Sequence, residues 1–366
     1  MDQISFLRDR VHQSRLRQQR QQLLIIALLA AVIGGWLWYS CVYSHTPEFA
    51  LKQLQQSAEA HDAEKFKKYI NANLLVSTAY DDLTIDLFDY DEALSESSKA
   101  MFKRFYILIR PQLVKGTADL ICRRVATGQW LMPGGGDILK GNQLGIDYEW
   151  FIEASLLRST EAGKIKNLIV EGRTATAELD VTNKLTGRPF TLRLALEPTA
   201  EGHWQVISVT NYRTYLTENL PLISRDTSAC IRDTQSVIST YNSSFMSLRD
   251  TFSQMTKKAR GTFNPQEQQA FKALIGDKLI PLLKARQAEL DAIPAAPGAA
   301  YFVALRRQST ETTIAAWQHF LAGILSGNPA DFNRAEELHK QEMELDRRIE
   351  AIIEHSTINQ DMQNLQ

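Results

Sequence analysis

The sequence predicts an α+β fold made of one N-terminal transmembrane helix, a helices-then-antiparallel-sheet cone-like domain and a C-terminal antiparallel helical bundle. Three observations lead to this prediction. An uncharged apolar run spans residues 23–43, a helical period of apolar residues continues to Leu157, and alternation of apolar and polar residues follows over four segments. From about Thr227 the helical spacing returns. Helices grouped before a sheet with short connections are typical of the α+β class.

Composition narrows the class of protein without identifying it. The chain has 366 residues, is 44% hydrophobic and 23% charged, and carries a formal net charge of -1. This length favours about two domains, and the absence of a basic excess argues against nucleic acid as a partner. Three cysteines (Cys41, Cys122 and Cys230) are too few and too scattered for a disulfide framework or a zinc site. No cofactor or metal is expected.

The run from residue 23 to residue 43 has the length of a membrane span, since about 20 apolar residues cross the ~30 Å hydrocarbon core. Arginines precede it, and the positive-inside rule then leaves the N-terminus in the cytoplasm and the bulk of the chain outside. A cleaved signal peptide or a lipoprotein cleaved at Cys41 is disfavoured, because the run ends in the bulky Trp-Leu-Trp-Tyr-Ser-Cys. The residues expected at the two membrane–water interfaces are Arg15, Arg17, Arg20, Trp36, Trp38, Tyr39 and Tyr43.

The domain organisation follows from these changes of pattern. We expect a cytoplasmic basic tail (1–22), a single-pass signal-anchor helix (23–43), an α+β domain (46–215), a helical bundle (227–355) and a polar tail (356–366). Thr46-Pro47 is a helix-start signal that opens the α+β domain. Pro221 is expected to prevent a continuous helix between the sheet and the bundle, and so to separate two outer lobes.

Four strands are predicted from alternating residues at 164–171, 174–182, 190–197 and 204–211. Gly172, Gly187 and Gly202 lie in the three connections, as hairpins require, so the sheet is expected to be antiparallel.

Three stretches of the chain resemble a group of uncharacterised bacterial single-pass membrane proteins: TPEFALKQLQQSAEAHDAEKFKKYI, then TAYDDL, and the closing strand HWQVISVTN. The outer domain of those proteins is similar to the cystatin-like cone of the nuclear-transport-factor type, in which a curved sheet wraps a helix. The resemblance covers residues 46–215. It implies a bacterial envelope setting and supplies no catalytic residues to carry over.

The helical C-terminal region is predicted to contain four antiparallel helices. The first carries an apolar stripe from Cys230 to Met255, the second begins at Asn264-Pro265 and is kinked at Pro281, and Pro294 to Gly298 marks a break. Gly327-Asn328-Pro329 separates the third helix from the fourth. Cys122 and Cys230 fall in different lobes, and two buried thiols are favoured over a disulfide between them.

Motifs for chemistry are incomplete. The Gly-rich segment from Met132 to Gly141 lacks the G-K-[ST] ending of a phosphate loop and is interpreted as a surface turn. A single E-x-x-H, Glu336 to His339, provides half of a di-iron carboxylate site and is interpreted as a solvated helix face. The acidic stretch from Asp81 to Glu92 lacks the spacing of a calcium loop.

Two functional hypotheses of different class follow. One is a non-catalytic, membrane-anchored, extracytoplasmic binding or scaffold protein of the bacterial envelope, with membrane lipid and an envelope protein or small ligand as partners. The alternative is an extracytoplasmic enzyme with a site in the mouth of the cone. A dry, apolar cone interior would favour the first hypothesis, whereas converging buried carboxylates or a histidine with a shifted pKa would favour the second. The sequence assigns no catalytic residue.

Overall fold

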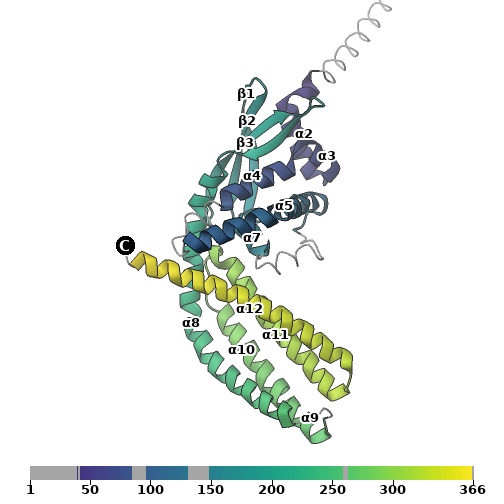
Figure 1. Cartoon of the computed structure of the whole chain (residues 1–366), viewed down its shortest axis with the longest axis vertical. Helices are drawn as coiled ribbons and strands as arrows, with labels where there is room; N and C mark the ends of the chain where they lie inside the picture. Colours follow the sequence, from purple (N-terminus) through teal and green to yellow (C-terminus); the bar gives the residue numbers. More distant parts are fainter. Residues whose placement is uncertain (1–38, 40–41, 85–95, 131–147, 259–262, 365–366) are drawn as a thin grey trace, which may run out of the picture.

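A computed structural model describes residues 39, 42–84, 96–130, 148–258 and 263–364 of the chain (Figure 1). Helices come first, then an antiparallel sheet, then long helices up to the C-terminus. In Figure 1 the sheet and the helices before it occupy one end of the molecule, and the long C-terminal helices form the other. The predicted α+β class and the bundle-like C-terminal region are confirmed.

The prediction of a transmembrane helix as part of this fold is corrected. No helix among the described residues is both long enough and apolar enough to cross a bilayer. The long helix α5 (Glu96–Thr127), for example, bears charged residues from its first turn to its last. The basic tail 1–22 and most of the apolar run 23–43 lie outside the described residues, which begin with Tyr39 and resume at Val42.

The first helices begin at the residues that the sequence signals. The Thr46 hydroxyl accepts a hydrogen bond from the Phe49 amide at 3.2 Å and starts α2, with Pro47 as its first residue. Asp62 caps the next helix in the same way, through the Lys65 amide at 2.9 Å. The elements of this part are η1 (Tyr43–His45), α2 (Pro47–Glu59), α3 (Ala63–Tyr69), α4 (Ala72–Thr84), α5 (Glu96–Thr127) and α7 (Tyr148–Ala154).

The sheet within the described chain has the strand order β1-β2-β3-β4 with antiparallel neighbours. Its strands are β1 (Thr160–Glu171), β2 (Thr174–Asn183), β3 (Pro189–Pro198) and β4 (Trp204–Val209). The four predicted strands are therefore confirmed, with β1 starting earlier than expected. Ala177 pairs with Leu194 and Leu179 with Leu192, which places the alternating apolar residues of both strands on one face.

That apolar face packs against the helices and leaves the interior of the sheet domain filled. At one end Ala177 and Trp204 pack on α2, and at the other Val181 and Leu192 pack on α4, α5, α7 and the start of α8. The largest side chains that are almost completely buried in this second cluster are Tyr80, Leu83, Leu120, Ile152, Leu156, Tyr215 and Leu216. We call the sheet and the helices that pack on it the α+β lobe. The cone-like arrangement expected for it stays a prediction.

The C-terminal helices form a second lobe with two apolar clusters of its own. These helices are α8 (Tyr212–Lys258), α9 (Pro265–Phe271), η3 (Lys272–Leu279), α10 (Ile280–Asp291), η4 (Pro297–Ala299), α11 (Ala300–Ser326) and α12 (Pro329–Asn364). Asn264 and Glu267 form a complete capping box at the start of α9. The predicted starts of the second and fourth helices are thus confirmed, and η3 has π-helical bonding just before Pro281.

The expectation that Pro221 interrupts the chain between the lobes is wrong. Helix α8 runs without a break through Pro221, over 47 residues. Both Pro221 and Thr217, whose carbonyl loses its helical donor, are exposed, so water can bind that carbonyl. Tyr215 belongs to the core of the α+β lobe and Cys230 to the core of the bundle. One helix therefore serves both lobes, across the predicted boundary between 215 and 227.

Candidate functional site

The predicted membrane-interface residues fall mostly outside the described chain. The described residues include Tyr39 and Tyr43 but not Arg15, Arg17, Arg20, Trp36 and Trp38. The Tyr39 ring is 48% exposed and lies 5.8 Å, centroid to centroid, from Phe49 of α2. Tyr43 lies 5.3 Å from the same ring. These tyrosines pack on the start of the α+β lobe, and their position at a membrane stays a prediction.

The single E-x-x-H motif does not form a metal site in the part of the chain that the structure describes. Glu336 pairs with Lys340 at 2.7 Å and His339 with Glu342 at 2.9 Å, as on a solvated helix face. No group of three possible metal ligands comes together among the described residues. The Gly-rich segment and the acidic residues after Thr84 lie outside them.

Both described cysteines are free thiols, as favoured from the sequence. Cys230 is buried at the start of the bundle core, whereas Cys122 is only partly buried.

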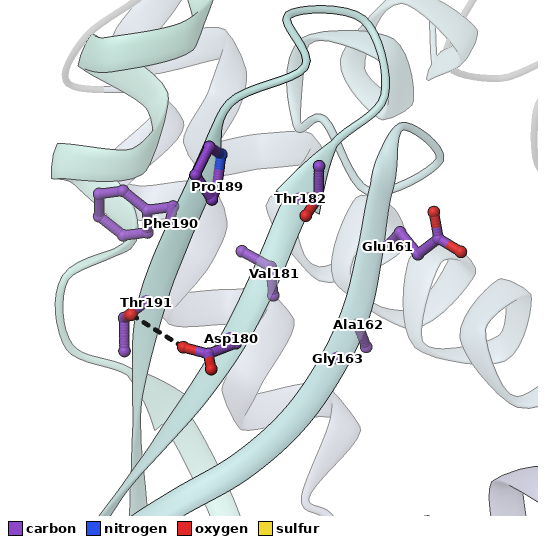
Figure 2. Close-up of a pocket in the computed structure, with 9 residues that line it drawn as sticks. All are labelled: Glu161, Ala162, Gly163, Asp180, Val181, Thr182, Pro189, Phe190 and Thr191. Atoms are coloured by element: carbon purple, nitrogen blue, oxygen red, sulfur yellow. Dashed lines mark hydrogen bonds between the residues drawn. The ribbon is translucent and has the colours of Figure 1, made fainter.

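A shallow hollow of about 690 Å³ lies across β1, β2 and β3 (Figure 2). It sits beside the register shift between Ala162 and Ile165, where a side chain on Gly163 would approach the Asp180 carbonyl oxygen to 3.1 Å. Asp180 is already engaged, because it pairs with Lys166 at 2.8 Å and accepts the Thr191 hydroxyl at 3.0 Å. The hydrogen bond from Lys166 lowers the pKa of Asp180. This carboxylate is held in its charged form and is a poor proton carrier.

A second cavity, of about 380 Å³, lies where the two lobes meet, and we call it the junction groove. One wall comes from α7, the start of β1 and the β2–β3 turn, and the other from α11. It is lined by Glu149, Glu153, Arg158, Ser159, Lys184, Leu185, Ala300, Tyr301, Ala304, Leu305 and Gln308.

Two carboxylates on α7 converge on one guanidinium in this groove. Arg158 Nη1 lies 2.7 Å from Glu153 Oε1 and 3.5 Å from Glu149 Oε1. Arg348 of α12 donates to the other oxygen of Glu149 at 3.1 Å, so the pairs link the lobes. Burial raises the pKa of Glu153, and Arg158 opposes that shift. Each carboxylate is therefore neutralised by an arginine. Ion pairs of this kind hold side chains in position and are poorly suited to proton transfer.

Inside the α+β lobe the buried hydroxyls satisfy one another. Tyr80 and Thr117 share a hydrogen bond of 2.5 Å, and Thr117 and Tyr148 share one of 3.0 Å. Burial raises the pKa of Tyr80 well above its ordinary value. Asn183 donates to the Tyr215 hydroxyl at 3.0 Å in a second network. The interior is thus a packed core with paired hydroxyl groups.

No protein family model, curated protein or solved structure matches the chain. The resemblance to cystatin-like envelope proteins accordingly stays a prediction, and any functional conclusion depends on the geometry above.

The residues of the junction groove were not singled out from the sequence. Glu149 and Glu153 are spaced four apart, and this local signal could have marked one wall of a site. Arg348 gave no signal, because it lies 199 residues from Glu149 and meets it only through the packing of α12 on α7.

Proposed function

We propose that the chain is a non-catalytic binding or scaffold protein of the bacterial envelope, which acts outside the membrane and binds its partner in the junction groove. The observation that carries this proposal is the pairing of Glu149 and Glu153 with Arg158 and Arg348 in an otherwise open groove. Side chains that are already ion-paired fix the shape of a binding site and can still form hydrogen bonds with a partner at its rim. The filled interior of the α+β lobe supports the same interpretation.

The chemistry of the groove indicates the kind of partner. Leu185, Ala304 and Leu305 supply the apolar part of the lining, and the exposed Lys184 and Gln308 supply polar groups. This lining fits a partner that combines an apolar group with hydrogen-bonding atoms. A segment of an envelope protein or a small ligand would provide both. The prediction of membrane lipid as a further partner, and of no nucleic acid, rests on the sequence alone.

One observation favours the alternative of an extracytoplasmic enzyme. Two carboxylates converge in the groove, and burial raises the pKa of Glu153, as is common for a general acid. Against this, Arg158 Nη1 lies 2.7 Å from Glu153 Oε1, and its positive charge favours the ionised carboxylate over the protonated form that a general acid needs. Binding is therefore the function that the geometry supports best.

Ala304→Trp and Glu153→Gln separate these hypotheses, with Ala288→Trp as the control. Ala304→Trp fills the groove from an exposed helical position, and Ala288→Trp places the same side chain at an exposed position on α10. Glu153→Gln keeps the shape of the carboxyl group and removes its charge. A photo-crosslinking residue at Gln308, in the native host, reports partner contact as a covalent adduct of defined mass.

We expect Ala304→Trp to lower the adduct yield and the cellular function together by about tenfold, or ~1.4 kcal/mol of binding free energy. Ala288→Trp should leave both unchanged, and Glu153→Gln should lower them by less than about threefold. An enzyme would respond in the opposite way, since Glu153→Gln would abolish function while the adduct persists. That outcome would overturn the proposal.

The outer location is tested separately. A thiol reagent that cannot cross membranes should label an Arg188→Cys variant, exposed in the β2–β3 connection, in intact cells. Labelling only after lysis would place this lobe in the cytoplasm.

A further inference from the structure

The bundle has a polar layer between its two apolar clusters. One cluster contains Cys230, Ile231, Ala299 and Phe302, and the other contains Phe271, Ile275, Ile280 and Ile324. Between them, Thr234 of α8, Arg286 of α10, and Arg306 and Thr310 of α11 face the interior. Thr234 and Thr310 are only 4% and 2% exposed. This layer takes no part in the junction groove.

Both arginines are held by threonine hydroxyls. Arg306 Nη1 donates to Thr234 Oγ1 at 2.5 Å, and its guanidinium carbon lies 4.2 Å from the centre of the Phe302 ring. Arg286 Nη2 donates to Thr310 Oγ1 at 3.2 Å. The two guanidinium groups are thereby fixed in place on neighbouring helices before any ligand arrives.

The layer has more donors than acceptors. A guanidinium has five N–H donors, yet in the described chain neither Arg286 nor Arg306 forms an ion pair. The Nε atom of Arg286 is buried without a hydrogen-bond acceptor. Asp346 and Glu342 of α12 attract Arg286 through their charge, but in the described chain neither forms an ion pair or hydrogen bond with it. Asp346 accepts the Ser309 hydroxyl at 2.6 Å, and Glu342 lies 2.9 Å from His339 Nδ1.

The environment of both arginines disfavours their charged form and lowers their pKa values. Burial, together with the nearby positive charge of Arg286, lowers the pKa of Arg306 to about 10. Burial also lowers the pKa of Arg286. A buried charge is normally paired, because leaving it without a counter-charge costs several kcal/mol.

We propose that Arg286 and Arg306 form a binding site for a small oxyanion, a phosphate or a carboxylate group, between α8, α10 and α11. A planar guanidinium matches two oxygens of such a group, and the anion would supply the acceptors that the layer lacks. The site joins three helices, so that its occupation ties α8 to the rest of the bundle.

Thermal unfolding of the full chain in detergent, monitored by intrinsic fluorescence, tests the site. Sodium phosphate and sodium acetate are compared with sodium chloride at matched ionic strength. The variants are Arg286→Met, Arg306→Met, the double variant, and Arg306→Lys, which keeps the charge and loses the fork. Arg307→Met is the matched control, because the neighbouring Arg307 is exposed and pairs with Asp291 at 2.8 Å.

We expect phosphate, acetate or both to raise the unfolding midpoint of the wild type by at least about 3 °C over chloride, in proportion to the logarithm of their concentration. Whichever of the two anions does so identifies the ligand class. The increase should persist in Arg307→Met, shrink in Arg306→Lys and vanish in the double variant. In chloride alone, Arg306→Met should unfold at the same or a higher temperature than the wild type, since it removes an unpaired charge.

Two results would overturn the proposal. The first is a wild type that responds to neither anion, and the second is a double variant that is folded by circular dichroism and still shows the full increase. Neither result bears on the junction groove, so the failure of this site and the failure of the proposed function are distinguishable.

Discussion

Gly298 shows how one residue sets the distance between two helices. It lies in η4, where a side chain would come within 2.7 Å of an Asp226 carboxylate oxygen and 3.1 Å of the Ile223 Cα on α8. The short turn can therefore press against α8 only because this position has no side chain. Close contact of this kind holds α11, which follows η4, beside the first long helix of the bundle.

Gly298→Ala is expected to destabilise the chain by about 1–3 kcal/mol, because the added methyl group has backbone on one side and must displace α8. Gly276→Ala is the matched control. A side chain there meets Leu321 at 3.6 Å, an ordinary contact, and replacing glycine within a helix stabilises by about 0.5–1 kcal/mol. Urea unfolding of both variants measures the difference, and equal midpoints would contradict this account of Gly298.

At the scale of elements, helix α8 carries the clearest local conflict in the chain. Pro221 lies inside it and cannot donate a hydrogen bond to the turn before. The helix persists because Tyr215 and Leu216, one turn earlier, are 1% and 0% exposed in the core of the α+β lobe. Burial in the tertiary structure therefore keeps this segment helical, although its proline disfavours a helix locally.

Pro221→Ala restores the missing donor and is expected to stabilise the chain by up to about 3 kcal/mol. Pro265→Ala serves as the control, since the first residue of α9 needs no amide donor and the change should stay within about 0.5 kcal/mol. Chemical unfolding of the two variants measures both changes in the free energy of unfolding. A Pro221→Ala variant less stable than the wild type would contradict this account of Pro221.

The elements differ in how far the sequence could predict them. Strands β2 and β3 alternate cleanly and are flanked by connections that contain glycine, so their bounds were predicted to within a residue or two. Helix starts at Thr46 and Asn264 were also evident, because a cap and a proline act locally. The continuity of α8 and the meeting of Glu149 with Arg348 could not be predicted, since both depend on contacts between distant segments.

At the scale of the whole molecule, the two lobes meet through shared structure and paired charges. Figure 1 shows α12 passing beside α7, where Arg348 reaches Glu149 at 3.1 Å. The side chain of Arg348 is 14% exposed and that of Glu149 is 35% exposed, so this ion pair is partly protected from solvent. The pair, together with α8, fixes how the bundle is oriented on the α+β lobe.

Arg348→Ala is expected to destabilise the chain by about 1–3 kcal/mol, because it leaves Glu149 with a weakened counter-charge at the junction. The adjacent Arg347→Ala removes an arginine that is 59% exposed and pairs within its own helix, so a change below about 0.5 kcal/mol is expected. Thermal unfolding compares the two. Equal losses would show that the junction gains nothing from this ion pair.

The length of α8 gives the molecule a mechanical property. At about 1.5 Å per residue, its 47 residues form a rod of roughly 70 Å. One end is embedded in the sheet domain and the other reaches the far tip of the bundle (Figure 1). Such a rod works as a lever arm: a small tilt at the embedded end becomes a large displacement at the tip, and a load applied at the tip returns to the sheet as torque.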